Sequence, residues 1–200
     1  MLYLSANQEE KMMKRVLFIL FGILMAGSAT LYAQRPQRIT VGSVSFYLAP
    51  DYKEKSRMPR SDGSESCMII PKNSKDNTRL ILRINPEELR NVNGLTDEEI
   101  KQILFRYVND HAGVFAKEKY GYKMESKYQV RYNKNADGSY FPHCYSYLNW
   151  RESDGKHYLS YTEAALVNRT IVCGTAIARD KGELKALTEI YSDVVGAANE

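Results

Sequence analysis

The sequence predicts an α+β domain in which an antiparallel sheet of about six or seven strands is packed by two main helices. Three observations predict this fold. Apolar and polar residues alternate in several short runs, as they do in half-buried strands. Two longer segments carry apolar residues at helical spacing behind a capping residue. Asp-Gly pairs divide the second half of the chain into segments of strand length, as in a meander of hairpins.

The N-terminal segment has the order of a secretory signal peptide. Lys14 and Arg15 precede an apolar run of about ten residues, 16–25, which is followed by small residues over 26–29 and then by Leu31-Tyr32-Ala33. A membrane-spanning helix needs roughly 20 apolar residues, which is more than this run offers. We therefore expect cleavage after Ala33.

Residues 1–33 are accordingly expected to be a leader, with translation starting at Met12 or Met13. The alternative is an uncleaved segment that tethers the chain to a membrane. Removing 33 of the 200 residues leaves 167, enough for a single α+β domain over residues 34–200. No later apolar run is long enough to cross a bilayer. The expected location of the mature protein is periplasmic or extracellular.

The mature chain is nearly balanced in charge, with 25 Lys and Arg against 22 Asp and Glu. Its basic residues are scattered along the sequence. Neither their number nor their spacing indicates nucleic-acid binding. The expected partner is a protein or an envelope polymer.

Strands are predicted first in the mature chain. Apolar and polar residues alternate from Val44 to Leu48, and Pro50 ends the strand. Residues 51–66 are polar, contain a proline and a glycine, and are typical of an exposed loop. The runs "CMIIP" and "TRLILRI" are the next strands. The turn-rich "KNSKDN" between them predicts an antiparallel hairpin.

The first helix is predicted from Thr96 onward, because Thr96 and Glu99 form a capping box. The following side chains fall on one stripe of the helix: Ile100, Ile103, Leu104, Tyr107, Val108 and His111. The helix ends at Gly113 or continues to Phe115.

Four strands are predicted after this helix, at about 127–135, 140–152, 157–167 and 170–178. Asp137-Gly138 and Asp154-Gly155 are predicted to be two-residue turns, and Asn168-Arg169 is a weaker third. With two-residue loops, the sequence numbers of two residues that face each other across a hairpin add up to 275 in the first hairpin, 309 in the second and 337 in the third.

This register assigns the side chains to faces. One face would collect Tyr128, Val130, Tyr132, Phe141, His143, Tyr145, Tyr147, Leu166, Ile171, Cys173 and Ile177. The other would be partly covered, with polar residues at one end: Gln129, Arg131, Ser146 and Glu163. Its other end would be apolar and could meet a second helix or a partner: Leu148, Trp150, Leu159, Tyr161 and Ala176. Cys144 and Cys173 would lie on opposite faces, about 9.6 Å apart over two strand spacings, so any disulfide should include Cys67.

A closing helix follows the strands. Asp180 caps it, and Glu183 completes a second capping box. Its apolar stripe consists of Leu184, Leu187, Tyr191, Val194 and Ala198.

Catalytic and metal-binding patterns are missing from the sequence: there is no GxSxG, HExxH, P-loop or GxGxxG. His111, on the helix stripe, and His143, on the aromatic face, are better explained as packed residues, and His157 as a solvated one. The three cysteines lack the close spacing of a redox or zinc site, so neither a metal nor a cofactor is expected. They are interpreted as small buried residues, at least one of them unpaired.

These absences favour a non-enzymatic binding or accessory domain. The alternative is a small hydrolase whose site is assembled from distant residues: His111, His143 and a cysteine. In the predicted register Cys173 and His143 share a face.

Aromatic residues are the remaining candidates for ligand contact. Tyr120 and Tyr122 alternate with lysines in "KEKYGYK" and are candidates to bind sugars or acidic polymers by stacking and cation–π contact. Trp150, at the apolar end of the partly covered face, is the third candidate. Packing within the sheet is the alternative role, because tyrosine suits half-buried strands.

The predicted order is a strand, a polar loop, two strands, a long helix, a meander and a closing helix. With the opening "VGSVSFYLAPDY" and the closing "GELKALTEIYSDVV", it resembles the PsbP-like fold over nearly all of residues 39–198. That fold is shared by a photosystem II extrinsic subunit, a Ran-binding nuclear transport factor and many small secreted bacterial proteins. The usual "P-x-x-W" after the first strand is absent, since Asp51-Tyr52-Lys53 follows Pro50. The resemblance implies an accessory or binding protein and carries over no functional residue.

Overall fold

A computed structural model describes residues 36–61, 63–74, 76–85, 94–116, 121–134 and 141–200, without the side chains of 114–116. The predicted leader and the predicted Asp137-Gly138 turn lie outside the described residues.

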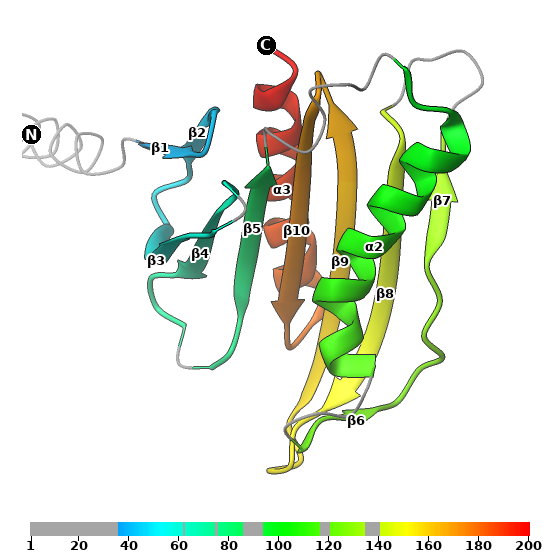
Figure 1. The fold of residues 1–200 in the computed structure, drawn as a ribbon. Helices are drawn as coiled ribbons and strands as arrows, with labels where there is room; N and C mark the ends of the chain where they lie inside the picture. The colour runs from blue at the N-terminus through cyan, green and yellow to red at the C-terminus, as the bar shows by residue number, and fades with distance from the viewer. Residues whose placement is uncertain (1–35, 62, 75, 86–93, 117–120, 135–140) are drawn as a thin grey trace, which may run out of the picture. The chain divides into compact units, whose positions relative to one another are not determined.

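Antiparallel strands form one large sheet in the order β3–β4–β5–β10–β9–β8–β6, and β7 also pairs with β8 (Figure 1). The strands are β3 (Tyr52–Pro59), β4 (Glu65–Pro71), β5 (Arg79–Asn85), β6 (Lys123–Met124), β7 (Arg131–Asn133), β8 (His143–Arg151), β9 (His157–Val167) and β10 (Thr170–Ala178). A separate hairpin consists of β1 (Gln37–Val41) and β2 (Val44–Leu48). Over the described residues the sheet has eight strands, one more than the upper figure expected from the sequence.

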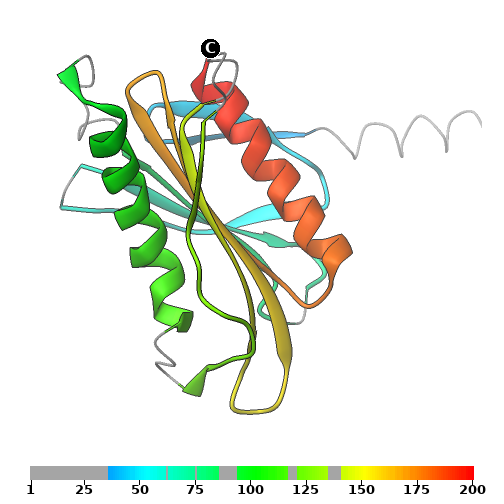
Figure 2. The ribbon, with the colours of Figure 1, turned by 90° about the vertical axis from the view of Figure 1, so that its right-hand side faces the viewer.

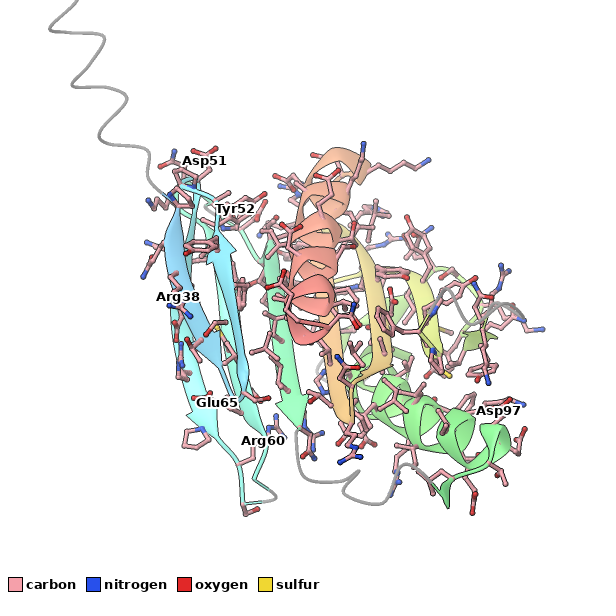
Figure 3. All side chains as sticks on the ribbon, turned by 90° about the horizontal axis from the view of Figure 1, so that it is seen from above. Arg38, Asp51, Tyr52, Arg60, Glu65 and Asp97 are labelled. Atoms are coloured by element: carbon pink, nitrogen blue, oxygen red, sulfur yellow. The ribbon has the colours of Figure 1, made fainter. Side chains whose placement is uncertain are left out.

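Helices α2 (Asp97–Ala116) and α3 (Lys181–Ala198) pack on opposite faces of this sheet (Figure 2). We call these the α2 face and the α3 face. Seen from above, the hairpin that carries Arg38 lies on the same side as α3, and Asp97 at the start of α2 lies on the other (Figure 3). The predicted α+β class, with an antiparallel sheet and two main helices, is confirmed.

Each face has its own hydrophobic core. The α3-face core includes Phe46, Leu48, Ile69, Leu80, Leu82, Val172, Leu187, Tyr191 and Val194. The α2-face core includes Leu104, Tyr107, Val108, Cys144, Leu148, Trp150, Tyr158, Ile171 and Cys173.

The capping box of α2 is formed as predicted. The Thr96 backbone N–H donates to the Glu99 carboxylate at 2.7 Å, and the Glu99 N–H donates to the Thr96 hydroxyl at 3.3 Å. Gly113 does not end the helix, which continues to Ala116.

The N-terminus of α3 is capped by Asp180, whose carboxylate accepts from the N–H groups of Gly182 and Glu183 at 2.7 and 2.9 Å. Glu183 accepts from the N–H of Arg179 at 3.2 Å, so the box closes one residue before the cap. The buried stripe of α3 consists of Leu184, Leu187, Ile190, Tyr191 and Val194.

The hairpin turns decide the register of the meander. Asn168 and Arg169 have φ angles of 44° and 68°, so they form a two-residue primed turn, and the β9–β10 pairs add up to 337 as predicted. Between β8 and β9 the pairs add up to 308, since Arg151 lies opposite His157. The Glu152 N–H donates to the carbonyl oxygen of Lys156 at 2.9 Å, so three residues, 153–155, remain in the loop, and the predicted two-residue turn is wrong. Its last residue, Gly155, has φ +84°, which suits the left-handed position of such a loop.

The β7–β8 pairs add up to 276, so the predicted value of 275 is also wrong. Of the described part of the predicted 127–135 strand, 127–134, only Arg131–Asn133 pair with β8 as a strand, and β6 lies earlier in the chain.

These one-residue differences exchange side chains between the faces, because neighbouring residues of a strand point to opposite sides. The predicted aromatic face is therefore divided. His143, Tyr145 and Tyr147 lie on the α3 face, whereas the following lie in the α2-face core: Tyr128, Val130, Tyr132, Leu166, Ile171, Cys173 and Ile177. The predicted apolar end is divided too, since Leu148 and Trp150 lie on the α2 face and the following lie on the α3 face: Leu159, Tyr161 and Ala176.

The prediction that Cys144 and Cys173 lie on opposite faces is wrong. Both lie on the α2 face, each directly opposite Ala164 of the strand between them. Two strand spacings, about 9.6 Å, still separate them, which is beyond disulfide reach. Cys67, Cys144 and Cys173 are all free and buried.

The predicted loop over 51–66 is wrong, because Tyr52–Pro59 form strand β3 at one edge of the sheet. The strand carries lysines, a proline and a register shift between Glu54 and Ser56. Edge strands use such features to avoid pairing with other chains. They also remove the apolar alternation by which a strand is found in a sequence.

Candidate functional site

A groove lies beside α3 on the outer part of the α3 face. Two adjoining cavities, of about 470 and 270 Å³, share the lining residues Glu163, Tyr191 and Ser192. A third, of about 310 Å³, adjoins the first at Tyr147. We call the three together the α3 groove.

Strand register places the aromatic residues of the groove. Tyr145 lies opposite Glu163, and Tyr147 lies opposite Tyr161, in neighbouring pairs of β8 and β9. The rings of Tyr145 and Tyr161 are 6.0 Å apart between centroids and tilted by 34°. The side chain of Tyr147 remains 42% exposed. The floor of the groove is thus an aromatic surface that is open to solvent.

Glu163 is the acidic residue in the floor. The hydroxyl of Tyr161 donates to its Oε2 at 2.6 Å. Burial raises the pKa of this carboxyl, whereas the Tyr161 hydrogen bond and the nearby His143 lower it. Because burial is the largest of these effects, Glu163 keeps its proton to a higher pH than an exposed glutamate does. A half-buried ionisable group in a cavity is a feature of functional sites.

His143 lines the second cavity and is 6% exposed. Its Nδ1–H donates to the carbonyl oxygen of Phe141 at 3.0 Å, and its ring lies 5.9 Å from that of Tyr145. The imidazole is therefore packed as a core residue while bordering the groove.

Basic side chains stand on two sides of the groove. Lys181 and Lys185, from the first turns of α3, line the large cavity. Lys127 and Arg131, from the segment beside β8, line the third cavity. All four are exposed, and Lys185 is 3.7 Å from Glu189. An anionic group in the groove would meet positive charge from either side.

None of the three thiols lines this groove: Cys67 lies in the α3-face core, and Cys144 and Cys173 lie in the α2-face core. Burial raises the pKa of Cys67 to about 12, of Cys144 to about 11 and of Cys173 to about 12. These thiols are therefore protonated near neutral pH, and a thiolate is the nucleophilic form. The prediction that Cys173 and His143 share a face is wrong, because His143 lies on the α3 face.

The other histidines lie elsewhere. His111 is half-buried on α2, and burial, with Arg83 and Arg60 as further causes, lowers its pKa to about 4. His157 is exposed beside the β8–β9 loop, with its Nδ1 2.8 Å from the carboxylate of Glu125.

Of the aromatic residues proposed from the sequence as ligand contacts, Tyr122 and Trp150 do not line the groove. Trp150 is fully buried, stacks on Tyr158 at 4.8 Å and meets the edge of Tyr122 at 4.7 Å. Tyr120 lies outside the described residues. Across the described part of the chain there is no group of three or more His, Cys, Asp or Glu side chains placed to hold a metal ion. Within the same residues, neither helix is long and apolar enough to span a membrane.

No family model matches the chain. No curated protein matches it either. Among solved structures, PsbP of the cyanobacterium Synechocystis sp. PCC 6803 is similar at 11% identity and a TM-score of 0.46, covering 82% of this chain and 91% of that one. A protein of unknown function from Pseudomonas aeruginosa, PA94, described as a putative regulator, has 9% identity and a TM-score of 0.32, covering 79% and 92%. The resemblance to the PsbP-like fold is thus found here too, as a weak likeness of architecture.

The groove was missed at the sequence level, although its parts were visible. Tyr145, Tyr147, Tyr161 and Glu163 all occupy odd-numbered positions in two predicted strands. The predicted β8–β9 register, which is one residue off, put Tyr161 and Glu163 on the other face. A three-residue loop ending in Gly155 would have brought them together.

Proposed function

We propose that residues 34–200 form an exported binding or accessory domain, in the periplasm or outside the cell, whose ligand lies in the α3 groove. The observation that carries the proposal is Glu163, a half-buried carboxyl group in the floor of an open, tyrosine-lined groove. Burying an ionisable group costs stability, so its presence in a cavity favours a role in binding. The signal-peptide pattern of residues 1–33 supports export.

A binding role agrees with the chemistry available in the groove. Its lining offers one carboxyl group, tyrosine rings and hydroxyls, and lysines at the rim. The cysteines that the alternative hydrolase would use are buried and protonated. A site that holds a ligand by a few polar groups and aromatic faces is typical of a binding pocket.

Export is tested by sequencing the N-terminus of the native protein from the envelope and from the culture medium. The expected first residue is Gln34. Native protein that still carries residues 16–33 would contradict a cleaved leader and support a membrane tether.

Ligand binding is tested on ¹⁵N-labelled protein of residues 34–200, titrated with small carboxylates, amines and disaccharides. Saturable shifts are expected for the amides of Tyr147, Tyr161, Glu163 and Ser192. Shifts confined to α2, or turnover of esters, glycosides or peptides by the same protein, would overturn the proposal.

A further inference from the structure

We infer that the α3 groove binds an acidic polysaccharide, whose sugar rings lie on the tyrosines of β8 and β9 and whose anionic groups meet the lysines and the arginine of the rim. This inference rests on the proposed function and names the chemical class of its ligand.

The shape of the groove suits a polymer. Its three cavities follow one another, joined first at Tyr147 and then at Glu163, Tyr191 and Ser192. Lining residues run along α3 from Lys181 to Gly196, which at 1.5 Å per residue is roughly 23 Å. A cleft of this length offers several contiguous sites, as a chain of repeated units requires.

The charge of the groove selects an acidic polymer. Four cationic side chains line it: Lys127, Arg131, Lys181 and Lys185. Among the described residues, the one acidic side chain that lines the three cavities is Glu163, and burial raises the pKa of its carboxyl group. Lys127 and Arg131 line the third cavity and the α3 lysines line the first, and the two cavities adjoin at Tyr147. Anionic groups on neighbouring units of a chain that crosses Tyr147 would therefore meet positive charge in both cavities.

The floor of the groove selects rings with hydroxyl groups. Tyrosine presents a flat apolar face and a polar tip, which suits the two sides of a sugar. The side chains of Tyr161 and Glu163 lie in this floor, and Ser192 lines the wall that α3 forms. The Ser192 hydroxyl donates to the carbonyl of Thr188 at 3.0 Å, and its oxygen still has acceptor capacity for a sugar hydroxyl.

The experiment measures binding of residues 34–200 to oligogalacturonate by titration calorimetry. A neutral malto-oligosaccharide of equal length, poly-L-glutamate and an oligo-dT strand are measured alongside. We expect oligogalacturonate to bind at least tenfold more tightly than each of the others, with an affinity that falls as salt is added. Equal binding of poly-L-glutamate would overturn the role of the rings, and equal binding of the neutral sugar would overturn the role of the rim. Tighter binding of oligo-dT would replace the polysaccharide with a nucleic acid.

Two pairs of variants locate the binding. Tyr147→Ala should weaken binding of oligogalacturonate roughly tenfold, whereas Tyr47→Ala should leave it unchanged, because Tyr47 is 65% exposed on β2. The double variant Lys127→Gln/Arg131→Gln should weaken binding to at least the same extent and flatten its salt dependence. The exposed pair Arg38→Gln/Lys72→Gln is the matched control. Equal losses in variants and controls would overturn the assignment to this groove.

The two proposals fail in different ways. If small carboxylates or disaccharides shift the groove amides while oligogalacturonate does not bind, the ligand class is wrong and the binding role stands. If no probe shifts the groove amides and oligogalacturonate does not bind, both proposals are overturned.

Discussion

Gly174 of β10 lies directly beneath the ring of Tyr191, and their contact sets how closely α3 approaches the sheet. A Cβ atom at this position would lie 2.3 Å from Cδ2 of the ring. The tyrosine is held in place, since it is buried and its hydroxyl donates to the carbonyl of Val172 at 3.0 Å. Burial also raises the pKa of this phenol. One missing methyl group therefore positions the helix that forms a wall of the α3 groove.

Gly174→Ala is expected to destabilise the protein by about 1–3 kcal/mol, because the added methyl group must displace a packed ring. Gly113→Ala, in helix α2, is the matched control. An added Cβ meets nothing within 4 Å there, so alanine is expected to stabilise the helix by up to about 1 kcal/mol. Urea denaturation of both variants measures the two free energies of unfolding. A stable Gly174→Ala protein would contradict the close approach of α3.

His111 is expected to make the folded state sensitive to acid. Its folded-state pKa, about 4, is below the ordinary value of 6.5, so the unfolded chain binds the proton more readily between these values. Stability from this group is present above pH 6.5 and is lost as the pH falls towards 4, by up to about 3 kcal/mol. The groups that act on the imidazole are Arg83 and Arg60, which lower its pKa, and Asp110, which raises it.

Unfolding measured by urea from pH 7 to pH 4 checks this expectation. In His111→Gln the fall in stability should be smaller, because glutamine cannot be protonated. The exposed His157→Gln is the control and should retain the fall. Parallel pH profiles for all three proteins would show that His111 has no such role.

The cysteines are expected to be unreactive in the folded protein. All three are buried, and burial raises their pKa values to about 11–12, so little thiolate is present at pH 8. Ellman's reagent should label none rapidly in native residues 34–200 and all three in guanidinium chloride. Rapid labelling of one thiol in native protein would show an accessible site that the described structure does not have.

At the scale of elements, the sequence predicts single helices and strands better than it predicts how strands pair. Both helices were found because caps such as Thr96 and Asp180, and the apolar stripes behind them, are local. Pairing registers depend on the number of loop residues, and Asp-Gly suits both two-residue and three-residue loops. The edge strand β3 was missed since charge and proline replace apolar alternation there.

The β9–β10 turn offers a test of backbone conformation. Arg169 has φ 68°, which a residue with a side chain adopts at a cost and glycine adopts freely. Arg169→Gly is expected to stabilise the protein by roughly 0.5–1 kcal/mol. Asn168→Gly should gain less, because it removes the hydrogen bond from Nδ2 to the Asn199 carbonyl, 2.9 Å long. Thermal denaturation ranks the two variants, and the opposite ranking would contradict the turn.

At the scale of the whole described unit, β10 contributes buried residues to both cores. Every residue from Ile171 to Ala178 is buried, with Val172 in the α3-face core and Ile171 in the α2-face core. The candidate groove arises at this scale too, since it needs the correct register of β8 on β9 and the placement of α3. The sequence patterns predict β8, β9 and α3, which form the groove, but not how these elements are placed relative to one another. The groove therefore could not be predicted from them.

Amide hydrogen exchange should be slowest in β10. Its backbone N–H groups lie in the middle of the sheet and beneath helices on both faces, so they exchange only when most of the structure opens. The amides of the edge strand β3 are expected to exchange faster by several orders of magnitude. Equal rates in the two strands, measured by NMR in heavy water, would contradict this hierarchy.

The placement of the three thiols has a consequence for how the chain folds outside a reducing compartment. Cys67 lies on the α3 face, and β9 separates Cys144 from Cys173 on the other face, so any cystine among them is incompatible with the finished structure. Collapse of the two cores must therefore outpace air oxidation. A polypeptide in which a disulfide forms before the cores do would be trapped in a cross-linked form, and only a reductant or an isomerase would allow it to fold.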